Sequence, residues 1–331
     1  MSKNSINWGI IGCGDVAEVK SGPAFQNVEN SFLNAVMRRN EEKLKDFAKR
    51  HHVEKWTTDA LELINDKSTN AIYIATPPSS HLPYAQQVIE AEKNIYLEKP
   101  MVLNSNEAKI LSNAVVNGKS KVTIAHYRRF LPVFIKVKEL LEADVIGTVL
   151  NAEITICQSK NANLIAKTDE NWRLNSEISG GGYFHDIAPH QIDLMCYYFG
   201  EVETIKGVDV EKNKSIVDVV KGSVLFKNGV QFKGRWDFNA FEDRDNCTIY
   251  GEKGDISFSF YGEKIIVTVE GKQKEYLFEN PKHVQQPMIE QTVGYFLGNN
   301  ANPCSVQEAV VVTKIMDVFC GVKKTINKLE R

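Results

Sequence analysis

The feature that most constrains the fold is a glycine-rich turn near the N-terminus. Ile6–Ile11 is an apolar run typical of a buried strand, and Gly12–Ala17 follows with the pattern G-x-G-x-x-A. Gly12 permits a tight turn, Gly14 lets the backbone approach a pyrophosphate at a helix start, and Ala17 allows close helix–strand packing. The motif therefore predicts a dinucleotide site, although a sharp turn that binds nothing also fits these residues alone.

Length and composition favour an ordinary globular protein. The 331 residues are 43% hydrophobic and 25% charged, which suits about two domains. A net charge of −2 gives no basic field for nucleic acid, and neither a membrane-spanning run nor a signal-peptide core is visible. The six cysteines are widely spaced without a C-x-x-C pair. We therefore expect reduced thiols, no metal site and a cytoplasmic location.

Strands and helices alternate through the first part of the chain. Alternation of this kind predicts a parallel, doubly wound sheet, and we assign residues 1–124 to a Rossmann dinucleotide-binding domain. Ligands of such sheets lie beyond the carboxyl ends of the strands. The residues that fall at these predicted ends are Gly12, Gly14, Arg38, Thr76, Pro77 and Lys99.

The residues after the second predicted strand bear on cofactor choice. NAD-binding folds often carry an acidic residue about 20 positions after the glycines, where it holds the ribose 2′-hydroxyl. Here Met37, Arg38 and Arg39 occupy that region. A guanidinium can bind a 2′-phosphate through two hydrogen bonds, so Arg38, with Arg39 as second choice, favours NADP over NAD. A solvated arginine pair at a strand end is the alternative.

Lys99 stands between Glu98 and Pro100 at the end of the fifth predicted strand. The proline restricts the backbone there, and the peptide bond before it is a candidate for the cis form. A lysine so placed can donate a hydrogen bond to a substrate hydroxyl or ketone and ease loss of the hydroxyl proton. A surface lysine paired with Glu98 is the commoner arrangement for this residue type.

The second part, residues 125–331, changes pattern. Short alternating strands separated by glycine and asparagine turns predict a large, mostly antiparallel open sheet in an α/β domain. We expect helices or another subunit to cover a face of this sheet, because a sheet of this size exposes much apolar surface. A final helix is predicted over Ser305–Lys328, opened by a capping box of Ser305 and Glu308.

A glycine-rich segment in this part leads into a helix with catalytic potential. Asp186 and His190 are four residues apart and so lie on one face of that helix. A carboxylate beside an imidazole can fix its tautomer, and histidine titrates near neutrality, which makes His190 the candidate general acid/base. A surface Asp–His pair without function is the alternative.

Six signatures occur in order: GCGDVA at 12–17, ATPPSSH at 75–81, EKP at 98–100, YRRF at 127–130, NWR at 171–173 and GGGYFHDIAPHQID at 180–193. Together they resemble the glucose–fructose oxidoreductase / inositol dehydrogenase / MocA family of pyridine-nucleotide oxidoreductases. The resemblance implies catalytic roles for Lys99, His190 and Asp186. It implies cofactor contacts by Gly12, Gly14, Asp15, Val16, Ala17, Arg38, Arg39, Thr76, Pro77, His81, Glu98, Lys99 and Arg128. It implies substrate contacts by Tyr127, Trp172, Arg173, Asp186 and His190.

The resemblance also implies an activity. Hydride passes between a nicotinamide cofactor, NADP by preference or NAD, and a secondary alcohol or ketone of a sugar, cyclic polyol or related diol. It further implies a homodimer or homotetramer formed through the C-terminal sheet. An NAD-dependent glycosidase and a non-catalytic nucleotide sensor are the alternatives, and the joint presence of Lys99, Asp186 and His190 speaks against the sensor.

Overall fold

The chain folds into two compact units in a computed structural model that describes residues 5–14, 17–159, 171–213, 216–322 and 325–327. Unit 1 is Met1–Arg128 with Pro281–Val310, and unit 2 is Arg129–Asn280 with Val311–Arg331. The sequence predicts a first domain of residues 1–124 and a second of residues 125–331. The structure instead groups a late segment, Pro281–Val310, with unit 1, and we call it the return segment.

Unit 1 is built on a parallel sheet, as predicted. Within the described residues its six strands are ordered β3-β2-β1-β4-β5-β6. The strands are β1 (Ile6–Ile11), β2 (Ser31–Met37), β3 (Lys55–Thr57), β4 (Ala71–Ile74), β5 (Asn94–Leu97) and β6 (Val122–Ile124). β1 pairs with both β2 and β4, so the connections diverge from β1 to the two halves of the sheet. This is the doubly wound order, which leaves a binding crevice at the carboxyl ends of the strands.

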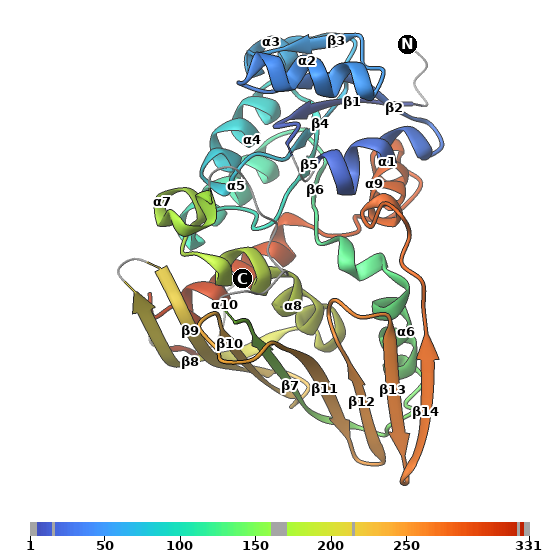
Figure 1. Ribbon diagram of the computed structural model, residues 1–331, viewed down its shortest axis with the longest axis vertical. Coiled ribbons are helices and arrows are strands. Elements are labelled where there is room, and N and C mark those ends of the chain that lie inside the picture. The colour runs from blue at the N-terminus through green and yellow to red at the C-terminus, as the bar shows by residue number, and fades with distance from the viewer. Residues whose placement is uncertain (1–4, 15–16, 160–170, 214–215, 323–324, 328–331) are drawn as a thin grey trace. The chain divides into compact units, whose positions relative to one another are not determined.

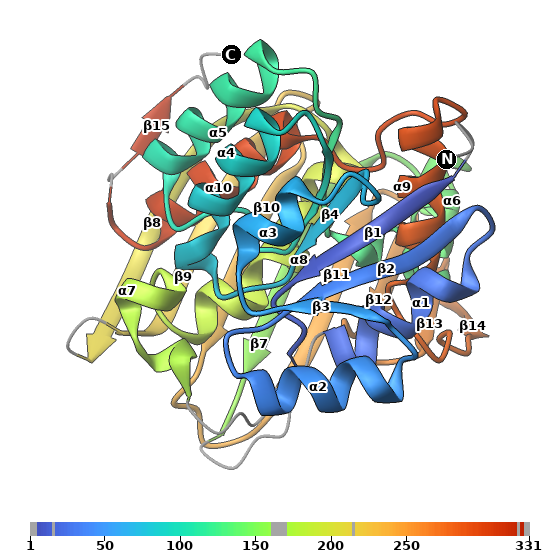
Figure 2. The same ribbon diagram turned by 90° about the horizontal axis from the view of Figure 1, so that it is seen from above.

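Helices cover both faces of this sheet (Figure 2). They are η1 (Ala17–Ser21, a π-helical turn), α1 (Gly22–Asn27), α2 (Glu41–Arg50), α3 (Ala60–Asn65), η2 (Pro78–Ser80), α4 (His81–Glu90), α5 (Ser105–Asn117) and α9 (Gln286–Leu297). Asn40 caps α2 by accepting a hydrogen bond from the Lys43 amide at 2.9 Å. The sequence analysis missed β3 and α3, because elements this short contain too few residues for a periodic pattern.

The return segment completes the core of unit 1. Trp8 is fully buried, and its ring centre lies 4.7 Å from the ring centre of Phe25 and 5.7 Å from that of Phe296 in α9. Lys121 donates hydrogen bonds to the carbonyls of Tyr295 and Phe296. Figure 1 shows α9 beside α1, although more than 250 residues separate them. Sequence periodicity identifies the apolar face of such a helix but not the surface against which it packs.

Unit 2 carries the predicted large sheet. Within the described residues its nine strands are ordered β14-β13-β12-β11-β7-β10-β9-β8-β15. They are β7 (Val149–Cys157), β8 (Val202–Asn213), β9 (Ile216–Phe226), β10 (Gln231–Asp237), β11 (Arg244–Gly251), β12 (Gly254–Phe258), β13 (Lys264–Val269), β14 (Lys272–Leu277) and β15 (Thr325–Asn327). Only the β7–β10 pairing among these strands is parallel, so the sheet is mostly antiparallel as expected.

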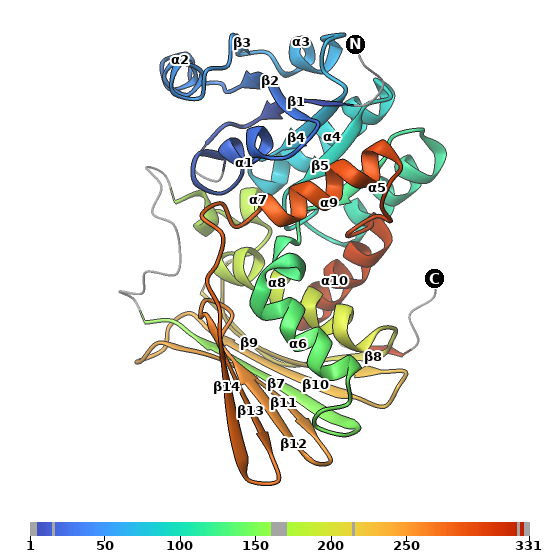
Figure 3. The ribbon, with the colours of Figure 1, turned by 90° about the vertical axis from the view of Figure 1, so that its right-hand side faces the viewer.

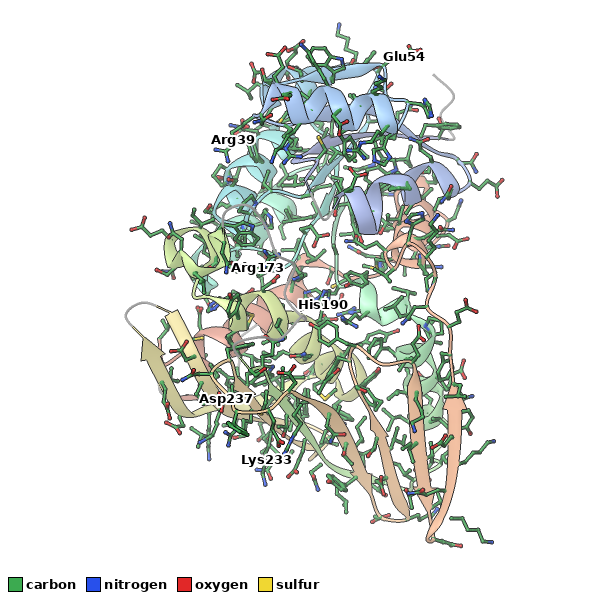
Figure 4. The ribbon with its side chains drawn as sticks, in the orientation of Figure 1. Arg39, Glu54, Arg173, His190, Lys233 and Asp237 are labelled. Carbon is green, nitrogen blue, oxygen red and sulfur yellow. The ribbon has the colours of Figure 1, made fainter. Side chains whose placement is uncertain are left out.

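Helices lie over one face of this sheet (Figure 3). They are α6 (Pro132–Glu142), α8 (Tyr183–Phe199) and α10 (Val306–Phe319), while η3 (Tyr127–Phe130), η4 (Trp172–Leu174) and α7 (Ser176–Ser179) are shorter. Along β10, Phe232 and Trp236 are buried, whereas Lys233 and Arg235 are exposed. Figure 4 shows Lys233 on the side of the sheet away from the helices. Lys233 is in register with Glu153. This row is polar, whereas other strand positions of the sheet, among them Val208, Leu225 and Leu277, expose apolar side chains.

The last helix begins as predicted but ends early. Ser305 and Glu308 form the expected capping box, with the Ser305 amide donating to the Glu308 carboxylate at 2.8 Å and the Glu308 amide donating to Ser305 Oγ at 3.2 Å. The helix ends at Phe319 instead of Lys328. Gly321 has φ +76° and, with the Val322 amide bonded to the Asp317 carbonyl, forms a Schellman C-cap.

Buried polar contacts fix α8 within unit 2. Both oxygens of Asp193 accept hydrogen bonds from the Arg129 guanidinium, at 2.7 and 2.9 Å, and both side chains are at most 2% exposed. The Arg129 guanidinium also lies 4.7 Å from the ring centre of Tyr197. On the sheet side, Trp236 Nε1 donates to Gln191 Oε1 at 2.6 Å.

None of the described helices has the length and apolar character that a membrane span requires.

Phe296→Ala tests whether the return segment belongs to the core of unit 1. Truncation leaves a cavity against Trp8, and we expect a loss of about 3 kcal/mol in the unfolding free energy of unit 1. Urea unfolding followed by tryptophan fluorescence measures it. Val116→Ala, at a position that is 69% exposed, is the control and should cost under about 0.5 kcal/mol. Equal effects of the two substitutions would contradict the assignment.

Asp193→Asn tests the buried ion pair. The amide keeps the shape of the side chain but leaves the Arg129 charge buried without its counter-charge, so we expect destabilisation by about 3 kcal/mol. Glu201→Gln breaks an ion pair with Lys227 in which both partners are more than half exposed, and it should change stability by less than about 1 kcal/mol. Comparison of the two denaturation midpoints decides whether burial gives the Arg129 pair its larger effect.

Candidate functional site

The glycine turn of unit 1 is fixed from both sides. The amides of Gly12 and Cys13 donate to the Met37 carbonyl at the end of β2, at 2.9 and 3.2 Å. Gly12 has φ +93°, and a Cβ there would lie 2.9 Å from Thr76, the second residue after β4. Only glycine fits this position, so the turn after β1 is locked between the ends of β2 and β4.

Gly14 has a different reason to be glycine. A Cβ added there would meet only the Gly12 carbonyl, at 4.0 Å, so packing within the described residues does not demand glycine. Nearby, the Thr76 hydroxyl is buried and has no hydrogen-bond partner among the described residues. The space at Gly14 lets a ligand approach the backbone closely, and the Thr76 hydroxyl can form a hydrogen bond with that ligand. Both features suit a dinucleotide, whose phosphates and sugar hydroxyls form hydrogen bonds. Asp15 and Val16, also predicted cofactor contacts, lie outside the described residues; Ala17 is fully buried, as close packing requires.

Arg38 reaches across the glycine turn. Its Nη1 donates to the Cys13 carbonyl at 3.1 Å, which holds the guanidinium at the end of β2 beside the turn. Arg39 is exposed and points away from unit 1 (Figure 4). The nearest acidic residues that follow, Glu41 and Glu42, lie in the first turn of α2.

His81 acts as a tether between two loops of unit 1. Its Nε2 lies 2.8 Å from the Thr76 carbonyl and its Nδ1 lies 2.9 Å from the Pro100 carbonyl. The Lys99–Pro100 bond is cis. Burial lowers the pKa of His81, against the opposing pull of these carbonyls. Since both ring nitrogens face backbone oxygens, His81 joins the β4 and β5 loops from beneath the predicted cofactor crevice.

The Glu98 carboxylate is buried behind Lys99. It is 6% exposed, and its Oε1 accepts hydrogen bonds from Tyr73 Oη and Gln285 Nε2, both at 2.6 Å. Its Oε2 accepts from the backbone amide of Lys99 at 3.2 Å. Glu98 is therefore not the carboxylate of an exposed surface pair, which was the alternative reading of Lys99.

The remaining candidates of unit 1 lie after β4 and β6. Pro77 follows Thr76 and is half-buried. Arg128 is 8% exposed, and its guanidinium stands 5.8 Å from the ring centre of Tyr127, which is also buried. Both residues belong to η3, at the end of the first segment of unit 1.

In unit 2, Asp186 is held by the predicted substrate residues. Arg173 Nε donates to Asp186 Oδ2 at 2.6 Å, and the Arg173 guanidinium lies 4.6 Å from the ring centre of Trp172. Arg173 is almost fully buried and Asp186 is 19% exposed. The pairing of Asp186 with His190 stays a prediction, and Arg173 gives this carboxylate a hydrogen bond that the spacing did not predict.

His190 is 5% exposed and lies on α8, four residues after Asp186, as the spacing predicted. Its neighbours on the helix are engaged in structural contacts: Gln191 with Trp236, and Asp193 with Arg129. Asp193 therefore anchors the helix that carries His190.

Among the described residues, no group of three or more His, Cys, Asp or Glu side chains is placed to hold a metal ion.

Two site residues escaped the sequence analysis. Tyr73 lies inside β4 and reads there as a strand residue, and Gln285 lies in the return segment, 187 positions from the carboxylate that it contacts. The local sequence signal for Tyr73 is its place between two isoleucines of a fully buried strand. A buried hydroxyl requires a hydrogen-bond partner, so a tyrosine there indicates a polar group nearby. No spacing rule identifies Gln285.

Comparison with known proteins connects this architecture to a family. Residues 6–126 match an oxidoreductase family with an NAD-binding Rossmann fold, and residues 134–257 match the GFO/IDH/MocA C-terminal domain. The chain is 65% identical to Oxidoreductase P35 of Formosa agariphila, over 96% of this chain and 99% of that protein. It is 31% identical to levoglucosan dehydrogenase of Pseudarthrobacter phenanthrenivorans, over 51% of this chain and 43% of that protein.

A solved structure of levoglucosan dehydrogenase in complex with NADH and levoglucosan has the same fold, with a TM-score of 0.86 at 20% identity over 98% of this chain and 99% of that chain. The resemblance inferred from the motifs is thus confirmed. With both domains matched, the chain belongs to the GFO/IDH/MocA family of NAD(P)-binding oxidoreductases.

Proposed function

We propose that this oxidoreductase transfers hydride between NADP(H) and a secondary alcohol or ketone of a sugar or cyclic polyol. The observation that carries the proposal is the common edge of unit 1. β1, β4 and β5 are adjacent and parallel, so Gly14, Thr76 and Lys99, which follow them, lie at one edge of the sheet. A dinucleotide cradle and an ammonium group therefore share that edge.

The substrate class rests on the polar character of the candidate residues and on the relatives. Trp172, Arg173, Asp186 and His190 combine an aromatic face with donors and acceptors, which suits a ring that carries several hydroxyls. The levoglucosan dehydrogenase that this chain resembles acts on a sugar derivative by its name. We extend that class, and not that particular substrate, to this chain.

In the proposed mechanism, Lys99 and His190 act on the same substrate oxygen. A bound nicotinamide supplies the acceptor or donor of hydride at the reacting carbon. In the oxidation direction, His190 takes the hydroxyl proton as the carbon–hydrogen bond breaks, and the alcohol becomes a ketone. The Lys99 ammonium donates a hydrogen bond to the oxygen and stabilises the negative charge that develops there. Asp186, held by Arg173, orients the substrate.

The preference for NADP rests on Arg38. The guanidinium lies at the end of β2, and no acidic side chain occurs between it and the start of α2. In this type of sheet that place faces the ribose of the adenosine half, so a 2′-phosphate would meet a positive charge. The NADH in the levoglucosan dehydrogenase complex shows that relatives of the same fold also use the other cofactor.

We also propose a homodimer or homotetramer formed through the outer face of the unit 2 sheet, in the cytoplasm. Support for the interface comes from the face itself: its exposed, in-register residues Lys233 and Glu153 carry opposite charges and can pair with a second copy. Support for the compartment comes from the six cysteines, which are widely spaced in the sequence and include no C-x-x-C pair.

Lys99→Met and His190→Ala test the mechanism. Each removes one group that meets the reacting oxygen, so we expect kcat to fall at least about a hundredfold while the dissociation constant of NADPH changes less than about threefold. A panel of sugars and inositols with spectrophotometric NADPH turnover provides the assay. Lys119→Met, at a position that is 76% exposed, is the control. Near-wild-type kcat in either variant would remove the assigned role.

The same assay separates the two reaction classes. A dehydrogenase changes the bulk amount of NADPH in proportion to product. A glycosidase that oxidises its substrate transiently would release sugar with no net change in NADPH, and that result would replace the proposed activity.

Arg38→Ala tests the cofactor preference. Loss of the guanidinium should weaken NADPH binding about tenfold, because a charge-assisted contact to phosphate disappears, and should leave NADH binding within about twofold. Isothermal titration with each cofactor measures both constants. Arg244→Ala in unit 2, where the side chain is paired with Glu242, serves as control. Tighter binding of NADH than NADPH by the wild type would contradict the preference.

A further inference from the structure

Behind the candidate catalytic turn, unit 1 contains a buried network that binding of a dinucleotide does not explain. It joins Ser21, Tyr73, Tyr96, Glu98 and Gln285, all of them buried. These side chains come from the end of η1, from β4, from the end of β5 and from the return segment. Four distant parts of the chain thus meet at one carboxylate.

The hydrogen bonds of this network have a fixed direction. Tyr96 Oη donates to Gln285 Oε1 at 2.9 Å, which turns the Gln285 amide nitrogen toward Glu98. Along the other branch, Ser21 Oγ donates to Tyr73 Oη at 3.1 Å, and the Tyr73 proton then goes to Glu98. Burial raises the pKa of both tyrosines well above the ordinary value, so both hydroxyls keep their protons.

Each branch therefore ends by donating to Glu98. Its Oε1 receives two hydrogen bonds at 2.6 Å, and its Oε2 receives the Lys99 amide. In all three of these bonds Glu98 is the acceptor. Fixed donors on one oxygen leave the other aimed at the backbone of Lys99.

The Lys99 backbone is held on its other side as well. Its peptide bond leads to Pro100, whose carbonyl contacts His81 Nδ1 at 2.9 Å. The position from which the Lys99 side chain extends is thus set by Glu98 before it and by His81 after it. Of these two supports, Glu98 is the one held by a residue of the return segment, Gln285.

We propose that Gln285 is a positioning residue for Lys99: by holding the Glu98 carboxylate, it fixes the backbone from which the lysine ammonium reaches the substrate oxygen. The inference rests on the proposed catalytic role of Lys99. It gives the return segment a part in the reaction, and it accounts for a glutamine whose side chain is 0% exposed.

Amide hydrogen exchange tests the positioning without any substrate. In full-length Gln285→Met, which preserves side-chain volume but removes both hydrogen bonds, the Lys99 amide should exchange about tenfold faster than in wild type. Gln286→Met, one position along in α9, should leave exchange in this peptide unchanged. Tyr73→Phe removes the other donor to the same oxygen and should accelerate exchange in the same direction, so the test does not depend on one variant folding.

Kinetics then test whether the positioning matters for reaction. Gln285→Met should lower kcat about tenfold, while KM and the NADPH dissociation constant stay within about twofold. Gln285→Glu should add a pH dependence of kcat to that of wild type. At low pH one carboxyl of the 285–98 pair keeps a proton and donates it, whereas at high pH the two carboxylates repel each other, so kcat relative to wild type should fall as the pH rises.

The outcomes separate the two proposals. If wild type turns over no sugar or polyol with NADPH or NADH, the proposed function fails, and hydrogen exchange alone decides whether Gln285 positions Lys99. Unchanged exchange at Lys99 in both Gln285→Met and Tyr73→Phe overturns the inference. Faster exchange with wild-type kcat overturns it too, because Gln285 would then have a structural role only.

Discussion

Parallel pairing of β1, β4 and β5 is the constraint on which the candidate site of unit 1 depends. Because the three strands run side by side in one direction, the residues that follow them must emerge at one edge. This is why the glycine turn, Thr76 and Lys99 lie at the same edge of the sheet. The Gly12 amide then ties the glycine turn to the end of β2, and His81 joins the loops that follow β4 and β5.

A second theme is the treatment of buried charge. A carboxylate removed from water is tolerated only when donors replace its hydration. Asp193 receives two bonds from Arg129, Asp186 receives one from Arg173, and Glu98 receives neutral donors instead of a counter-charge. Each of these carboxylates lies within a few residues of a proposed catalytic group, so the same contacts that stabilise the fold also orient the chemistry.

The features that the sequence predicts correctly are those that depend on residues close together in the chain. The glycine turn, the capping box of Ser305 and the helix spacing of Asp186 and His190 are local patterns, and the structure contains all three. The early end of α10 was also encoded locally, by Gly321, but the apolar periodicity of the helix masked it. The contact between Asp186 and Arg173 was not visible in the sequence, because helix spacing identifies neighbours on the same helix and not residues of η4.

The return segment marks the limit of such reasoning. Phe296 and Gln285 contact Trp8 and Glu98 across most of the chain length, and neither contact follows from periodicity, capping or motif spacing. Loop-closure entropy grows only slowly with separation, so such distant pairs cost little more than nearer ones once the intervening unit has folded. Because α9 of the return segment is part of the core of unit 1, that core cannot be complete until the return segment has been synthesised. The network at Glu98 gives the same dependence to the candidate catalytic lysine.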